Sequence, residues 1–165
     1  MARRLLKEVK EMRDIIVESE RLSIVPRDLE AMKQLFEEEA DDDMKLAYAD
    51  MLAAMRDLPG REEWGTEWAI TLKTGELVGG ICFKGEPDAE GSVEIGYGIK
   101  GEHQHQGYAT EAVGAMLRWA LEQEGVKKIC AQTDLRNIIS QRVLIRNGFL
   151  RDGFGDEGPR FVYVK

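Results

Sequence analysis

The sequence predicts one domain of the α/β or α+β class, with helices packed on the faces of a sheet. The chain has 165 residues, enough for one domain with a full hydrophobic core and too few for two. Segments with the two-residue period of strands are interleaved with segments of helical period. No internal repeat or long linker separates them. Their order is a strand, two helices, three strands, a helix, a strand, a helix and a strand pair.

The first part of the domain combines a short strand with two helices. Residues 21–25 alternate polar and apolar side chains and end at Pro26, which predicts the strand. Asp28 can cap a helix, and an acidic run, residues 37–43, forms a loop to the next one. The apolar face of the first helix consists of Leu29, Met32, Leu35 and Phe36. The apolar face of the second helix consists of Met44, Tyr48, Met51, Leu52 and Met55.

The rest of the chain contains the other strands and two further helices. Residues 68–73 and 76–84 read as a strand pair, with a bulge at Gly79 and Gly80, and residues 92–99 as a third strand. A long amphipathic helix begins near residue 109 and ends at Gly125, and a strand over 127–133 follows. Asn137 opens a last helix that finishes at Asn147 and Gly148, before strands over 149–154 and 160–164.

The N-terminal residues 1–17 carry apolar side chains at helical spacing among alternating charges. They predict an amphipathic helical extension, residues 1–19, ahead of a domain spanning 20–165. Such a helix can pack on its own domain, pack on the second chain of a homodimer, or dock on a membrane surface or a partner. Because it lacks an uninterrupted apolar core, it does not resemble a secretory signal.

Composition narrows the classes of partner. A net charge of -8 argues against non-specific nucleic-acid binding, because the phosphate backbone would be repelled. No apolar stretch approaches the ~18 residues needed to cross a bilayer. Cys82 and Cys130 lie far apart in apolar stretches, so we expect buried thiols rather than a disulfide or metal site, which fits a reducing cytoplasm.

The polar turn at residues 101–110 is the strongest functional signal. It joins a strand to a long helix, and this arrangement leaves backbone N–H groups free near the positive end of the helix dipole, so it predicts an anion site. Gly107 lets the backbone approach an anion, and Ala109 permits close packing at the helix start. The turn has no basic residue except the histidines, and neither a dinucleotide fingerprint nor a P-loop is present. A tight turn without a ligand is the alternative.

Three motifs in order resemble those of the GNAT superfamily of acetyl-CoA-dependent N-acetyltransferases. They are Gln104-x-x-Gly107-x-Ala109 after a strand with two glycines, then Asn137-x-x-Ser140 about 30 residues later, then Asn147-Gly148-Phe149. Together with residues 20–26 they are similar to the branch of ribosomal-protein alanine acetyltransferases, and the resemblance covers residues 20–165 in element order. It implies a mixed, mostly antiparallel sheet of about six to seven strands flanked by about four helices.

The resemblance also implies a donor site for acetyl-CoA, with no metal. Backbone groups of Tyr97, Gly98 and Ile99 would pair with the pantetheine arm where the strand splays from its neighbour, although two glycines can also weaken a strand that binds nothing. Asn137 would hold the pantetheine or a water, or it simply caps its helix with Ser140 as the i+3 partner. The pyrophosphate would be bound by the turn residues Gln104, His105, Gln106, Gly107, Tyr108, Ala109 and Thr110.

Amine acetylation requires a base, because an amine with a pKa near ~10 is protonated at neutral pH. Glu94 stands ten residues before Gln104, where family members carry a catalytic glutamate, and we expect it to be buried beside an apolar sheet; a solvent-facing Glu is the alternative. The acid that many members carry as a tyrosine is Leu144 here, so Ser140 is the candidate acid. The missing tyrosine leaves a second function open, a non-catalytic acyl-CoA-binding or interaction module on the same fold.

The acceptor amine is expected between the first two helices and the sheet. The methionines at 44, 51 and 55 could line an adaptable wall or pack as ordinary core. The acidic run 37–43 could attract a cationic amine or simply be solvated. His103 and His105 are too sparse for a metal site and fit solvent-facing residues with occasional phosphate contact. A protein N-terminus and a small-molecule amine are both compatible with these features.

Overall fold

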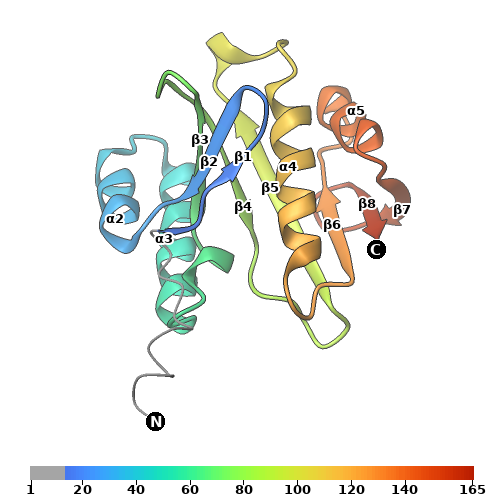
Figure 1. Cartoon of the computed structure of the whole chain (residues 1–165), viewed down its shortest axis with the longest axis horizontal. Helices are drawn as coiled ribbons and strands as arrows, with labels where there is room; N and C mark the ends of the chain where they lie inside the picture. The colour runs from blue at the N-terminus through green and yellow to red at the C-terminus, as the bar shows by residue number, and fades with distance from the viewer. Residues whose placement is uncertain (1–13) are drawn as a thin grey trace.

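The computed structural model describes residues 14–165, and over this range it contains an eight-stranded sheet. The strand order is β1-β2-β3-β4-β5-β6-β8-β7, and every neighbouring pair is antiparallel except β5 and β6, which are parallel. The mixed, mostly antiparallel sheet with helices on its faces is confirmed, with one strand more than expected (Figure 1). The strands are β1 (Val17–Glu18), β2 (Leu22–Pro26), β3 (Glu67–Leu72), β4 (Leu77–Phe83), β5 (Ser92–Ile99), β6 (Lys128–Gln132), β7 (Leu150–Phe154) and β8 (Pro159–Val164).

The additional strand is β1, at the end of the segment that the sequence assigns to an N-terminal helix. Val17 and Glu18 pair antiparallel with Ile24 and Ser23 of β2, so the expected helix is wrong for these residues. The apolar residues that suggested a helix here include Ile15, which is buried in the main core. Residues 1–13, the rest of the expected helix, lie outside the described range.

Four α-helices flank the sheet over the described residues. They are α2 (Leu29–Glu38), α3 (Asp42–Asp57), α4 (Tyr108–Glu122) and α5 (Ile138–Arg146), and the short 3-10 helices η2 (Glu62–Trp64) and η3 (Gly101–His103) lie between them and the strands. Asp28 caps α2 by accepting a hydrogen bond from the backbone N–H of Ala31, as expected. α4 ends at Glu122, slightly before the expected Gly125, with Gln123 as its C-cap.

The acidic run at residues 37–43 joins the two helices as expected, but only residues 39–41 are a loop, and the rest form helix ends. Its first residues complete α2, and Asp41 caps α3 by accepting a hydrogen bond from the N–H of Met44 at 2.9 Å. Asp42 and Asp43 occupy the first turn of α3, where carboxylates are favoured by the helix dipole. This local role explains much of the run without any ligand.

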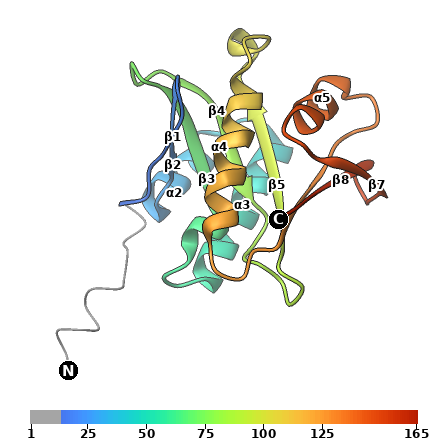
Figure 2. The same cartoon turned by 45° about the vertical axis from the view of Figure 1, so that its right-hand side comes forward.

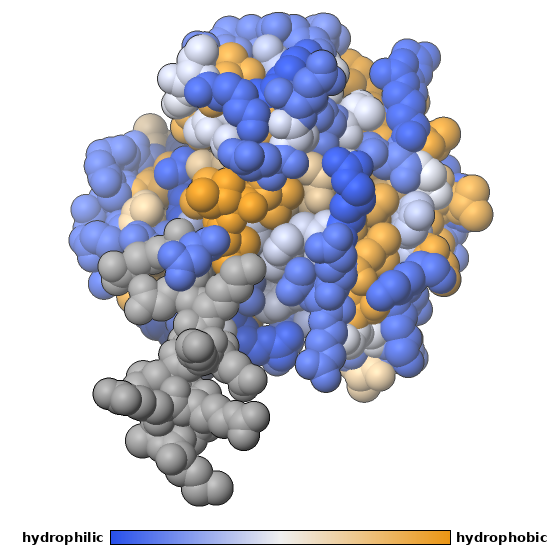
Figure 3. Space-filling view, in the orientation of Figure 1, coloured by the Kyte–Doolittle hydropathy of each residue, from blue (hydrophilic) through white to orange (hydrophobic). Residues whose placement is uncertain are grey.

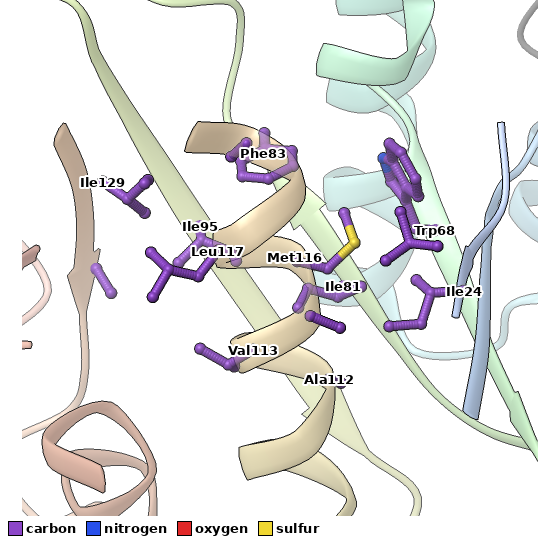
Figure 4. Close-up of a cluster of buried hydrophobic side chains, with 14 of the residues drawn as sticks. Ile24, Trp68, Ile81, Phe83, Ile95, Ala112, Val113, Met116, Leu117 and Ile129 are labelled. Carbon is purple, nitrogen blue, oxygen red and sulfur yellow. The ribbon is translucent and has the colours of Figure 1, made fainter. Parts of the chain in front are cut away.

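The main core lies between α4 and one face of the sheet. Side chains of α4 point at strand residues from β2 to β6, as the close-up of labelled residues shows (Figure 4). Indole rings add to this contact: Trp119 of α4 lies 4.9 Å from Trp68 and 5.2 Å from Trp64, measured between ring centroids. Burial of this apolar and aromatic surface is the main force that holds α4 on the sheet.

The opposite face of the sheet carries α2 and α3, which form a smaller core of their own (Figure 2). Met32, Tyr48, Leu52 and Met55 are buried there, and Met51 packs against them. Packing is therefore confirmed for Met51 and Met55 of the methionine stripe, whereas Met44 is exposed. Of the three methionines, only Met44 is therefore left to line an adaptable wall for the acceptor.

One irregularity lies beside Gly79 and Gly80, where the sequence predicts a bulge. Ile70 pairs with Gly79 but Thr71 pairs with Leu77, so Val78 is the extra residue on β4. The bulge is therefore confirmed one residue before the glycine pair. A bulge increases local twist and re-aims neighbouring residues.

The face shown in Figure 3 is covered mostly by polar and charged residues, with apolar residues in separate patches. Among residues 14–165, no helix combines the length and apolar character that crossing a bilayer requires. Within the same range, no cluster of three or more His, Cys, Asp or Glu side chains is arranged to hold a metal ion.

Candidate active site

The site is a cleft that opens where β5 and β6 separate. The two strands pair only from Ser92 to Glu94 on β5, against Lys128 to Cys130 on β6, so the rest of β5 has no partner on that side. A cleft of about 480 Å³ lies there, between the second half of β5, the turn before α4, and α5. Its walls include Tyr97, Gly98 and Ile99, the three residues expected on the splayed edge.

The turn at the top of the cleft has an unusual backbone. His105 has a φ of 63°, the only positive φ at a non-glycine among the described residues, and Gly107 has a φ of 82°. Positive φ at a residue such as histidine is costly and tends to persist where a site requires it. The N–H groups of Tyr108, Ala109 and Thr110 have no acceptor inside α4, and all three residues line the cleft. The turn therefore presents free donors at a helix N-terminus.

Two side chains fix this turn, and the sequence motif contains only one of them. Gln104 donates from Nε2 to the carbonyl of Ile99 at 3.0 Å, so it positions the turn. Arg21, the residue before β2, donates to the carbonyl of Gln106 at 2.9 Å and pairs with Glu111 of α4 at 2.7 Å. Arg21 was missed because its partners are about 90 residues away along the chain.

The α5 wall brings Asn137 and Ser140 to the cleft. The Asn137 side chain accepts a hydrogen bond from the N–H of Ser140 at 3.1 Å, so the helix-cap interpretation is confirmed. The Ser140 hydroxyl is 2.7 Å from the hydroxyl of Tyr97, which reaches across the cleft from β5. Burial raises the pKa of Tyr97, while its hydrogen bond to Ser140 lowers it by a smaller amount. The tyrosine hydroxyl therefore stays protonated at neutral pH and can donate.

The Tyr97 hydroxyl adds a group to the site, because the family resemblance implies a role only for the backbone of this residue. Leu144, where family members carry a tyrosine, is fully buried in the core. A tyrosine hydroxyl nevertheless reaches the cleft, from β5 instead of α5. The sequence contains little sign of this contact, since a tyrosine in a strand does not indicate which helix its hydroxyl will contact.

Two arginines of α5 also line the cleft. Arg142 and Arg146 stand four residues apart and so share one face of the helix. Neither forms an ion pair with another residue of the range 14–165. The positive charge that the turn itself lacks is therefore supplied by the fold from the opposite wall.

Glu94 does not have the apolar surroundings that the sequence analysis expects. Its carboxylate lies 3.2 Å from Nζ of Lys84 and accepts a hydrogen bond from Nε2 of Gln132 at 3.1 Å. It is the last residue of β5 paired with β6, so it lies at the narrow end of the opening. The expectation of an apolar environment is wrong, because strand residues beside it place polar side chains on the same face.

The structure therefore brings most of the expected donor-site residues to one cleft. Gln106 and Glu94 are not among its lining residues, because the Gln106 carbonyl turns to Arg21 and Glu94 lies on the opposite face of β5 from Tyr97. His103, by contrast, lines the cleft and lies 3.4 Å from Glu76. The expected residues present are Tyr97, Gly98, Ile99, Gln104, His105, Gly107, Tyr108, Ala109, Thr110, Asn137 and Ser140.

Comparison with known families agrees with this geometry. The model of the acetyltransferase (GNAT) domain matches residues 18–150. The chain belongs to the GNAT family. Among curated proteins, it is 37% identical over 98 residues to the uncharacterized N-acetyltransferase YjdG of Bacillus subtilis, an alignment covering 59% of this chain and 58% of the relative. It is 30% identical over 84 residues to the ribosomal-protein-serine acetyltransferase of Escherichia coli, covering 51% and 47%. The chain thus spans about half the length of the curated relatives it matches.

Solved GNAT structures share the whole fold at low sequence identity. RimL in complex with coenzyme A superposes with a TM-score of 0.71 at 15% identity, covering 91% of this chain and 98% of RimL. A GNAT-family acetyltransferase from Bacillus anthracis superposes with a TM-score of 0.67 at 23% identity, covering 91% and 98%. These likenesses establish a common fold.

Proposed function

We propose that this GNAT protein is an acetyl-CoA-dependent N-acetyltransferase that acts on a primary amine by direct attack. The observation that carries the proposal is the cleft at the β5 and β6 opening, which joins free helix N–H groups to the Tyr97–Ser140 hydroxyl pair. A protein N-terminus and a small-molecule amine remain the two acceptor classes. The ribosomal-protein-serine acetyltransferase among the relatives supports the first.

On the donor side, the turn would bind the pyrophosphate through the N–H groups of Tyr108, Ala109 and Thr110, with the helix dipole adding to the attraction. The unpaired edge of β5 from Tyr97 to Ile99 has backbone groups free for the pantetheine arm. Arg142 and Arg146 would supply the positive charge opposite the phosphates.

On the leaving-group side, the amine forms a bond to the thioester carbonyl carbon, and the carbon–sulfur bond then breaks. The departing thiolate takes a proton from the Ser140 hydroxyl, and Ser140 is reprotonated from Tyr97 or solvent. The step also needs a base for the amine, and Glu94 is the candidate predicted from the sequence. Covalent catalysis through Cys82 is disfavoured, because burial raises the pKa of its thiol to about 11 and so keeps it neutral.

A screen for acetyl-CoA consumption against a panel of amines tests the proposal. The panel contains peptides that begin with serine or alanine, together with polyamines and aminoglycosides. Turnover with any of them supports a transferase. Acetyl-CoA binding without turnover would favour the non-catalytic module, and the absence of binding would contradict both.

Replacement of Arg142 or Arg146 by alanine is expected to weaken acetyl-CoA binding about 5- to 10-fold, because each removes a charge-assisted contact of about 1 kcal/mol. The double variant should also lose much of the salt dependence of binding. Isothermal titration at two salt concentrations measures both effects. Arg136→Ala is the control, since Arg136 is paired with Asp134 and does not line the cleft. Equal affinity in all variants would remove the arginines from the donor site.

Replacement of Gly107 by alanine is expected to weaken acetyl-CoA binding about 10-fold or more. A methyl group there would lie 3.3 Å from Arg21 in a left-handed backbone conformation, so the turn and Arg21 must shift. Gly60→Ala is the matched control, because Gly60 has a φ of 80° with nothing within 4 Å of an added Cβ and lies in the loop after α3, outside the cleft lining. Both variants should lose similar stability, and only the first should lose affinity in titration. Equal losses of affinity would contradict an anion site at this turn.

A further inference from the structure

A largely buried carboxylate outside the cleft has no role in the function proposed above. Glu67, the first residue of β3, has a side chain only 17% exposed. Its single ion pair, to Nε of Arg27, is 3.6 Å long, and its carboxylate accepts no hydrogen bond from residues 14–165. Buried carboxylates are normally hydrogen-bonded. The accepting capacity of Glu67 is therefore free for a ligand.

The place of Glu67 on the sheet follows from strand register. Glu67 pairs with Cys82 and Cys82 with Gly96, while Ala69 pairs with Gly80 and Gly80 with Gly98. Paired residues in a sheet share a face, so Glu67 lies on the same face as Gly80, Gly96 and Gly98, which we call the glycine floor. Trp68 points instead into the core beneath α4, so this is the face that carries α3.

The carboxylate of Glu67 extends over the glycine floor. A methyl group on Gly80 would overlap Oε1 of Glu67, so the carboxylate occupies the space where a side chain of residue 80 would stand. Gly98 is the neighbour of Gly80 on β5, about 4.8 Å away across the strands. An added Cβ on Gly98 would have nothing within 4 Å, and Gly98 lines the donor cleft. The space beside Gly98 is therefore open at the donor edge, one strand away from the position that the carboxylate covers.

Glu94 is less suited to receive a proton from a ligand. Its carboxylate is already engaged by Lys84 and Gln132. It lies four residues from Gly98 along β5, about 13 Å at the usual rise per residue. Gly80 lies next to Gly98 of the donor edge, and the Glu67 carboxylate covers it, so no side chain of residue 80 stands between them.

The chemistry of Glu67 suits a base. Burial raises its pKa, and the charge of Arg27 lowers it by a smaller amount, so its proton affinity moves toward neutral pH. The other titratable groups beside it are Tyr48 of α3 and Cys82 of β4. The pKa of each is raised mainly by burial, and both stay neutral near pH 7. The guanidinium of Arg27 is the charge that acts on the carboxylate, and Lys84 and Glu94 lie on the same face beside Cys82.

We propose that Glu67 accepts the proton of the acceptor ammonium, which binds over the glycine floor on the face of α3. The proposal rests on the transferase function proposed above. One N–H proton of the ammonium passes to the Glu67 carboxylate and then to solvent, which leaves a neutral amine. The amine nitrogen bonds to the thioester carbonyl carbon, its second proton is lost as the carbon–sulfur bond breaks, and the thiolate is protonated from the Ser140 side. The net reaction consumes an ammonium and acetyl-CoA and yields the amide, CoA thiol and one proton.

The test compares Glu67→Gln with Glu94→Gln and with the control Glu90→Gln, whose side chain is 80% exposed. Each variant is assayed between pH 6 and 10 with the best peptide amine from the screen. For Glu67→Gln we expect kcat/KM at pH 7 to fall about 100-fold, with unchanged acetyl-CoA affinity. The loss should shrink as the pH approaches the amine pKa of ~10, because the free amine then needs no base. Glu90→Gln should match the wild type.

Thermal unfolding separates a catalytic loss from a folding defect. A carboxyl group whose pKa is raised in the folded state destabilises the fold as pH rises above its unfolded value. Glu67→Gln removes this cost, so its melting temperature at pH 7 is expected to equal or exceed that of the wild type. A protein that gains stability while losing turnover at neutral pH would be a strong sign of a functional carboxylate.

Three results would overturn the proposal. One is an unchanged rate for Glu67→Gln at pH 7, and another is a loss that is equal at every pH. The third is a loss for Glu94→Gln that shrinks at high pH while Glu67→Gln behaves as the control, which would make Glu94 the base and leave the transferase function standing. If the wild type turned over no amine, the transferase function itself would fail and this proposal with it.

Discussion

Replacement of Ser140 by alanine is expected to lower kcat about 100-fold with little change in acetyl-CoA affinity. The loss follows because the Ser140 hydroxyl is the group placed to protonate the leaving thiolate, and such transfer contributes about 100-fold or more. The variant keeps the helix cap, since Asn137 bonds the backbone N–H of Ser140. Steady-state kinetics with acetyl-CoA and the best amine from the screen measures the effect.

Tyr97→Phe separates the two members of the hydroxyl pair. Phenylalanine keeps the ring on β5 and removes only the group that lies 2.7 Å from Ser140. We expect a loss of about 10-fold, because Ser140 can still be reprotonated by solvent. Ser23→Ala on distant β2 is the control and should match the wild type. A wild-type kcat in Ser140→Ala would mean that solvent protonates the thiolate.

Replacement of Trp68 by alanine is expected to destabilise the fold by about 4 kcal/mol. Trp68 is fully buried, packs edge-on to Trp119 of α4, and donates from Nε1 to the carbonyl of Glu63 at 2.9 Å. Alanine would leave a cavity and an unpaired carbonyl at the contact between α4 and the sheet. Since domains of this size have about 5–15 kcal/mol of total stability, the variant should be close to unfolding.

Urea unfolding followed by circular dichroism measures the change. Phe154→Ala is the matched aromatic control, because Phe154 lies on edge strand β7 with 68% exposure and should cost less than about 1 kcal/mol. A small effect for Trp68→Ala would show that the core collapses around the cavity or that α4 docks without this indole.

Local sequence patterns predicted most of the elements because their causes are local. Asp28 and Asn137 cap the helices that they were expected to begin, and the apolar period of α4 matches the side chains packed beneath it. The turn from Gln104 to Thr110 was recognised from its own residues, since helix N-termini present free N–H groups wherever they occur. The helix predicted for the segment before β2 is wrong at its end, because Ile15 and Val17 are buried through contacts with the sheet core rather than along a helical face.

The site was predicted less completely where it depends on distant contacts. The pattern around Gly107 marked the anion side, but Arg21, Arg142 and Arg146 approach that side from other elements. Glu94 was singled out by its distance from the turn, yet its neighbours Lys84 and Gln132 come from β4 and β6. The spacing of residues along the sequence does not show which side chains lie beside one another in a sheet.

The sequence by itself determined the fold class, the order of elements, the free donors at the start of α4 and the resemblance to GNAT proteins, because period, caps and glycine conformations act over a few residues. Only the tertiary structure decided which groups meet: Tyr97 with Ser140 across the cleft, and Glu67 over Gly80 beside the open edge of β5. The physical reason is that burial, charge and register depend on residues brought together from far along the chain.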